Sequence, residues 1–182
     1  ITNVGKAHLL GFGSFAGVIR TKGELYDYLR ENHGTAFINN DNPHLKGISA
    51  GLRLIRYGQN DADGLLVKGS LIECNPMLKF RWSPQPTQFS PYEVQTHLIG
   101  SYNLDNVLAA ACIGTLFAVP AEDISHALAE YVPSNNRSQL TVTEHNKLVV
   151  DAYNANPTSM KAALDNYSLI KAEHKMCILG DM

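Results

Sequence analysis

The chain has 182 residues, of which 45% are hydrophobic, and a formal net charge of −2 at pH 7. This composition suits one good hydrophobic core or two small ones, and it excludes a disordered tail. Lysine and arginine are scattered along the chain, so no basic surface for nucleic acid is expected. The longest apolar stretch, residues 107–119, is shorter than the about 20 residues of a bilayer span, so no membrane insertion is expected.

The cysteines are Cys74, Cys112 and Cys177, an odd number of widely separated thiols with apolar neighbours. This pattern favours core thiols over a disulfide framework. It is typical of a protein in a reducing cytoplasm.

The first half of the chain predicts a strand–helix–strand rhythm followed by strands alone. Ser14 can cap the first helix and Gly34 can end it. The expected elements are a helix over 14–34, a strand over 36–38, a helix over 44–52, and strands over 54–57, 65–68, 72–82 and 92–98. Because the last three strands have no helices between them, they indicate an antiparallel meander appended to a parallel arrangement.

The second half of the chain predicts two helices, a linker and a hairpin. The expected elements are helices over 103–119 and 120–131, a hairpin of 139–144 with 147–151, and a strand over 175–179. The polar segment 133–138 resembles a linker, so a domain boundary is expected near Ser134. This boundary divides the chain into two expected domains, residues 1–133 and residues 134–182.

The most informative stretch is residues 151–160, with the sequence DAYNANPTSM. It follows the apolar strand 147–150 and places Pro157 where a first helical turn accepts proline. In parallel α/β sheets, ligands bind where strands end and helices begin. The stretch is therefore either a nucleotide-binding turn or an asparagine-rich turn that only caps a helix.

Three segments in the same order resemble the Mur ligase family. They are residues 1–24, which include ITNVGKAHLLGFGS and KGE, residues 100–106 (GSYNLDN), and residues 151–160. The last is most similar to the branch that joins D-alanyl-D-alanine to UDP-N-acetylmuramoyl-tripeptide. The resemblance implies an α/β fold: a Mur ligase central domain, with a mixed sheet, flanking helices and a β meander, followed by the start of a Rossmann-like C-terminal domain.

The resemblance also implies an activity, with ATP and Mg²⁺ as cofactors. A cytoplasmic, monomeric ligase of peptidoglycan precursor synthesis would phosphorylate the tripeptide carboxylate, and the dipeptide amine would attack the acyl phosphate. The printed sequence has no G-x-x-x-x-G-K-[ST] motif, so the phosphate-binding loop is expected upstream and this chain alone is expected to be inactive. Two alternatives are a non-catalytic adenine-nucleotide-binding module and another Mur-type amino-acid ligase.

His8 and Lys22 are the catalytic and metal-site candidates. A lone loop histidine is usually structural, and a lysine on a polar helix face is usually solvated. The resemblance implies instead that His8 helps to hold magnesium and that Lys22 is carbamylated, which would give the cation the anionic oxygens it prefers.

Asn103 and Asn106 are the candidates for the adenine side of a nucleotide. From the residues alone, an asparagine N-cap is the favoured interpretation of Asn103. The resemblance implies that Asn103 contacts adenine, since an amide both donates and accepts hydrogen bonds. Tyr102 stands where the family usually has histidine.

The resemblance places the remaining nucleotide contacts in the second half of the chain. It assigns Arg137 to the phosphates, as suits a planar cation, and Asp151 to the ribose hydroxyls. Tyr153, Asn154 and Asn156 would border the nucleotide and the incoming acyl group.

Overall fold

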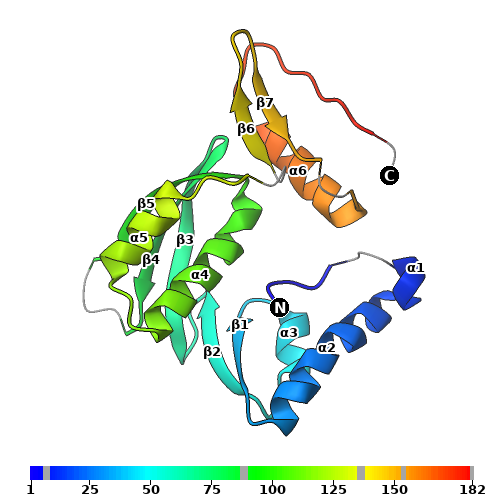
Figure 1. Ribbon diagram of the computed structural model, residues 1–182, viewed down its shortest axis with the longest axis vertical. Helices are drawn as coiled ribbons and strands as arrows, with labels where there is room; N and C mark the ends of the chain where they lie inside the picture. Colours follow the sequence, from blue (N-terminus) through cyan, green and yellow to red (C-terminus); the bar gives the residue numbers. More distant parts are fainter. Residues whose placement is uncertain (6–8, 87–89, 135–137, 153–154, 181–182) are drawn as a thin grey trace.

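The computed structural model describes residues 1–5, 9–86, 90–134, 138–152 and 155–180. Its centre is a five-stranded sheet in the order β1-β2-β3-β4-β5 (Figure 1). The strands are β1 (Thr35–Asn39), β2 (Arg53–Gly58), β3 (Leu65–Cys74), β4 (Met77–Pro84) and β5 (Tyr92–Ile99). The first three are parallel and the last three antiparallel, so the predicted meander is confirmed as a continuation of the parallel part.

Helices cover this sheet from two directions. α4 (Leu104–Leu116) lies across β1 to β4, and α5 (Ala121–Glu130) packs against β5. α2 (Phe15–Glu31) and α3 (Pro43–Ile48) contact β1 instead. The remaining short helices are α1 (Leu9–Phe12) and the 3₁₀ turn η1 (Ser101–Asn103). Within the described residues, no helix is both long and apolar enough to cross a bilayer.

The ends of α2 show how the sequence fixes a helix boundary. The Ser14 hydroxyl accepts a hydrogen bond from the Gly17 amide at 3.0 Å, as expected for an N-cap. At the other end His33, not Gly34, adopts the left-handed conformation with φ of 51°. Gly34 serves a different purpose, because a Cβ there would lie 2.6 Å from Leu29 Cδ2. The helix therefore ends where predicted, but the left-handed residue is histidine.

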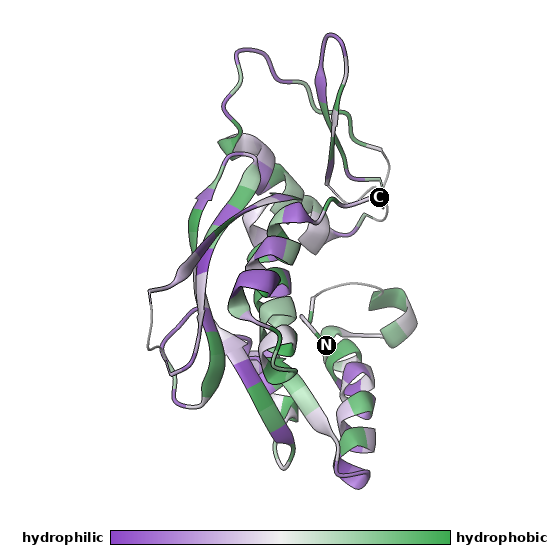
Figure 2. Ribbon diagram, turned by 60° about the vertical axis from the view of Figure 1, so that its left-hand side comes forward, coloured by the Kyte–Doolittle hydropathy of each residue, from purple (hydrophilic) through white to green (hydrophobic). Residues whose placement is uncertain are grey.

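The hydrophobic core lies between α4 and the sheet. Leu108 and Ala111 of α4 are fully buried beside Phe80 and Trp82 of β4, and Figure 2 shows hydrophobic residues along these elements. Gly69 in β3 allows the helix to approach closely, because a Cβ there would lie 2.3 Å from Leu108 Cδ2 and 2.8 Å from a backbone oxygen. The helix position therefore depends on the absence of a side chain in β3.

The second half of the chain adds a smaller unit, drawn at the upper end of Figure 1. β6 (Gln139–Val142) and β7 (Lys147–Val150) form the predicted antiparallel hairpin, and α6 (Pro157–Leu169) follows. The hairpin tip is hydrophilic in Figure 2. The two strands pair only with each other among the described residues, so they form a separate sheet.

Four details differ from the sequence predictions. Residues 72–82 are not one strand, because a turn at Asn75-Pro76 separates β3 from β4. The helix expected over 44–52 ends at Ile48. Residues 175–179 form no strand, since no described strand pairs with them.

The fourth difference concerns the cysteines. Cys112 is buried, and burial raises the pKa of its thiol to about 12, so it fits the predicted core role. Cys74 is half-buried and Cys177 is exposed, which makes the core assignment wrong for Cys177.

Gly69→Ala should destabilise the chain by about 1–3 kcal/mol, because the added methyl group overpacks the contact between β3 and α4. Urea unfolding followed by the fluorescence of Trp82, the single tryptophan, measures this loss. Gly47→Ala in α3 is the matched control: a Cβ there meets nothing within 4 Å, and alanine favours the helix by about 1 kcal/mol. Equal stability of the two variants would contradict the packing argument.

Candidate functional site

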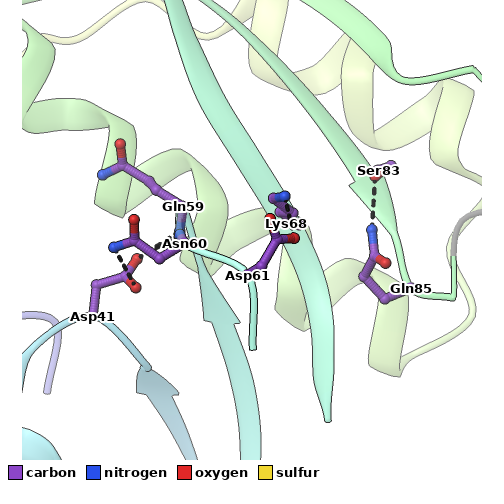
Figure 3. Close-up of polar contacts among 7 residues, drawn as sticks. All are labelled: Asp41, Gln59, Asn60, Asp61, Lys68, Ser83 and Gln85. Atoms are coloured by element: carbon purple, nitrogen blue, oxygen red, sulfur yellow. Dashed lines mark hydrogen bonds and ion pairs between the residues drawn. The ribbon is translucent and has the colours of Figure 1, made fainter. Parts of the chain in front are cut away.

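A polar network closes the carboxyl ends of β1 and β2 (Figure 3). Asp41, two residues after β1, accepts hydrogen bonds from the Gln59 amide at 2.5 Å and from Asn60 Nδ2 at 2.9 Å. The Asn39 side chain accepts from the Asp41 amide at 2.9 Å. Beside this network, Asp61 pairs with Lys68 of β3. Because the Asp41 carboxylate is held by two residues from the end of β2, the two strand ends are locked together.

The network continues into the first turn of α4. Gln59 Nε2 donates to Asp105 Oδ1 at 3.2 Å. Burial is the main cause that raises the pKa of Asp105, and the hydrogen bond from Gln59 partly offsets it. The N-terminus of α4 therefore lies at the same end of the sheet as the ends of β1 and β2. This is the end at which parallel α/β sheets bind ligands.

Asn103 and Asn106 lie at this end, and Asn103 does not act as a side-chain N-cap. Its Nδ2 donates to the Ile99 carbonyl at 2.8 Å, and its Oδ1 accepts from Asn106 Nδ2 at 3.0 Å. The capping interpretation of Asn103 is therefore wrong. Asn106 is exposed, and its carbonyl oxygen has no hydrogen-bond partner in the described part of the chain. Among the described residues, the pair thus presents the Asn106 carbonyl oxygen as an unpaired acceptor at the start of α4.

Asp151 is tied to this end through two other side chains. The Ser138 hydroxyl, just before β6, donates to Asp151 Oδ2 at 3.2 Å and also contacts the Tyr102 hydroxyl. Tyr102 directly precedes Asn103 in the sequence, so the structure connects Asp151 to the segment that carries Asn103. Ser138 was not predicted as a site residue, and no local motif marks it.

Lys22 is half-buried in α2, beneath the N-terminal segment. Its Nζ donates to the Asn3 carbonyl at 3.0 Å, beside a hollow of about 390 Å³ lined by Ile1, Thr2 and Leu25. No carboxylate of the described residues pairs with Lys22. As an unmodified ammonium group the side chain has donors only and cannot ligate a cation.

Asn156 has a defined structural role. Its side chain accepts from the amides of Thr158 at 3.1 Å and Ser159 at 3.0 Å, and the Ser159 hydroxyl accepts from the Asn156 amide at 3.1 Å. This is a capping box, with Pro157 in the first helical turn. The helix-cap interpretation is confirmed for Asn156, and a ligand contact by the same residue stays a prediction.

Four predicted site residues lie outside the described residues: His8, Arg137, Tyr153 and Asn154. Within the described ranges, no three histidine, cysteine or acidic side chains are grouped as a metal site would require. Sequence reasoning also missed the bonds from Gln59 to Asp41 and to Asp105, which join residues 18 and 46 positions apart.

Comparisons with known proteins identify the family of the chain. The Mur ligase middle domain family matches residues 1–114, which is more than half of the chain. The chain belongs to the Mur ligase family. The polar network at the ends of β1 and β2 and the start of α4 fall within this match.

Two similar relatives are UDP-N-acetylmuramoyl-tripeptide–D-alanyl-D-alanine ligases. The one from Bacillus subtilis is 32% identical over 187 residues, and the one from Escherichia coli K12 is 29% identical over 186 residues. Both alignments cover the whole chain. They cover only 38% and 40% of the respective relative, so the chain spans about two fifths of the length of these relatives.

Solved structures of Mur ligases share the fold. MurF from Acinetobacter baumannii superimposes with a TM-score of 0.75 and 24% identity, covering 91% of this chain and 36% of that one. MurF from Thermotoga maritima, solved in complex with ADP, gives a TM-score of 0.73 and 20% identity, covering 90% and 37%. The central-domain architecture predicted from the sequence is confirmed.

Asn156→Ala should destabilise α6 by about 1 kcal/mol, because the amides of Thr158 and Ser159 lose their acceptor. Asn156→Asp is the matched control, since a carboxylate at the N-cap accepts the same hydrogen bonds. Amide hydrogen exchange in residues 157–169 reports the difference. Unchanged protection in Asn156→Ala would contradict the capping role, and reduced nucleotide affinity in Asn156→Asp would reveal a separate ligand contact.

Proposed function

We propose that the full-length protein is an ATP-dependent ligase that joins D-alanyl-D-alanine to UDP-N-acetylmuramoyl-tripeptide in peptidoglycan precursor synthesis. Family membership and the names of the relatives support this proposal. The single structural observation that supports it is the link from Tyr102 through Ser138 to Asp151, which connects Asp151 to the segment just before α4.

In this proposal the start of α4 and the second half of the chain bind different parts of ATP. The side-chain amides of Asn103 and Asn106 can both donate and accept hydrogen bonds, which suits the adenine edge, and the Asn106 carbonyl oxygen is the acceptor left unpaired by the described residues. The Asp151 carboxylate accepts hydrogen bonds from the ribose hydroxyls, and Arg137 reaches the phosphates. Tyr153, Asn154 and Asn156 border the nucleotide and the acyl group. A boundary near Ser134, between the central domain and a Rossmann-like C-terminal domain, would let the two parts close on the substrates and exclude water.

The reaction needs positioning more than a protein nucleophile. The tripeptide carboxylate takes the γ-phosphoryl group and ADP leaves, then the dipeptide amine attacks the acyl carbon and phosphate leaves, which yields an amide. The site's own task is to hold the reacting groups in line and neutralise their charge. We place this chemistry in the cytoplasm, in a monomeric enzyme.

Magnesium would supply charge neutralisation at the phosphates. Lys22 fits this role only as a carbamate, because the unmodified ammonium group, which donates to the Asn3 carbonyl, has no lone pair for a cation. The hollow beside it, about 390 Å³, leaves room for the added carboxyl group. His8 is the second proposed ligand.

Asp151→Asn should weaken ATP binding to the full-length protein about tenfold to a hundredfold, since a charged hydrogen-bond acceptor is lost. Calorimetry with ATP measures this change. Binding of D-alanyl-D-alanine is the internal control and should not change. Wild-type ATP affinity would remove Asp151 from the nucleotide site.

Lys22→Ala in the full-length protein should abolish most ligase activity, and added short carboxylates should restore part of it by replacing the carbamate oxygens. Phosphate release measures both effects. The matched control is Lys46→Ala in α3, which should keep wild-type activity because Lys46 lies outside the proposed site. Wild-type activity in Lys22→Ala would reject the metal role. An ordinary surface lysine can be replaced with a change of only about 0.5 kcal/mol in the free energy of unfolding.

The 182-residue chain by itself should not release phosphate from ATP, even with both peptide substrates present. It has no phosphate-binding loop in its sequence, and that loop supplies both positioning and electrostatic stabilisation. Magnesium-dependent turnover by the purified chain would contradict this expectation. If the full-length protein binds ATP but forms no amide, the non-catalytic module is the better description.

A further inference from the structure

Tyr102, Ser138 and Asp151 form a three-residue hydrogen-bond chain, here named the seam. It joins the segment before α4 to the start of β6 and the end of β7. Ser138 is 5% exposed, so the middle of the seam is shielded from water. One end of the seam is Tyr102, which precedes Asn103. The other end is the Asp151 carboxylate, which is proposed to bind the ribose hydroxyls.

The hydrogen-bond inventory of the seam fixes its direction. A serine hydroxyl has one hydrogen, and Ser138 gives it to the acceptor-only carboxylate of Asp151. Tyr102 must therefore donate to Ser138. Burial is the largest cause that raises the pKa of Tyr102, and the charge of Asp151 adds to it, so the phenol keeps its proton at neutral pH. The chain of donors runs from Tyr102 to Asp151, and each bond polarises the next.

Two backbone features hold the seam in place. Gly100 has a φ of 95°, and a Cβ there would lie 2.2 Å from Cε1 of Tyr102, so only glycine leaves space for the ring. Ser138 has a φ of 49°, a left-handed conformation that is uncommon outside glycine and costs about 1–3 kcal/mol. This buried, strained serine is oriented by its two partners. Backbone strain of this kind concentrates where a side chain must point in one direction.

We propose that Tyr102 is a positioning residue whose hydroxyl, acting through Ser138, orients the Asp151 carboxylate toward the nucleotide ribose. This inference rests on the proposed function of Asp151. It gives a role to the position at which this chain departs from the histidine usual in its family. The tyrosine hydroxyl is a hydrogen-bond donor near neutral pH, so it can donate to Ser138. Ribose binding by Asp151 then depends on the contact between the two parts of the chain.

Tyr102→Phe in the full-length protein tests the proposal, because it removes the hydroxyl and keeps the ring against Gly100. The expected result is a twofold to tenfold weaker affinity for ATP, as for one lost neutral hydrogen bond. Affinity for 2′,3′-dideoxy-ATP, which lacks the ribose hydroxyls, should not change. Ser138→Ala interrupts the same chain and should give the same ATP-only loss. Tyr28→Phe, at an exposed tyrosine of α2, is the matched control and should bind both nucleotides as the wild type does.

The two nucleotides separate positioning from mere structural support. A loosened fold would weaken ATP and 2′,3′-dideoxy-ATP equally, and that result would overturn the proposal. Tyr102→Phe combined with Asp151→Asn should bind ATP no worse than Asp151→Asn alone, whereas additive losses would also overturn it.

The Asp151→Asn arm distinguishes this inference from the proposed function. If Asp151→Asn weakens ATP binding while Tyr102→Phe binds like the wild type, the seam has no positioning role and the ribose contact stands. If Asp151→Asn leaves ATP affinity unchanged, the ribose contact itself is wrong and the inference falls with it.

Discussion

The close packing of α4 on the sheet is the constraint on which the site depends. Gly69 lets Leu108 reach the strand backbone, and the resulting core fixes where α4 begins. Because α4 begins at the carboxyl end of β1 and β2, Asp105 joins the polar network there. The same placement sets Asn103 and Asn106 beside it. A helix shifted by the width of one methyl group would misplace every one of these side chains.

The seam extends this placement into the second half of the chain. Ser138 is buried although it precedes a small, separate hairpin, and it connects Tyr102 to Asp151. Asp151 is thus held by the segment before α4 as well as by its place after β7. Under the proposed function, this contact would couple the approach of the two parts to the shape of the nucleotide site.

Short-range sequence signals predicted the helix caps correctly. The differences between prediction and structure arise where contacts join residues that are distant in the sequence. Ser14 and Asn156 cap their helices because the acceptor and the amides it serves are three residues apart or fewer. Residues 175–179 have the composition of a strand, but a strand needs a partner, and none of the described strands provides one. Tyr102 and Ser138 lie 36 positions apart, so no spacing rule could bring them together. The family resemblance predicted Asp151 as a site residue, whereas only the fold shows that Ser138 donates a hydrogen bond to it.

A structure of the full-length protein with a non-hydrolysable ATP analogue tests the central claim most directly. The claim is that residues from both halves of the chain bind one nucleotide at the same end of the sheet. The account predicts the adenine edge against Asn103 and Asn106 and the ribose hydroxyls on the Asp151 carboxylate, with the seam intact. A nucleotide bound with its ribose away from Asp151, or a site in which Asn103 and Asp151 face different ligands, would contradict it.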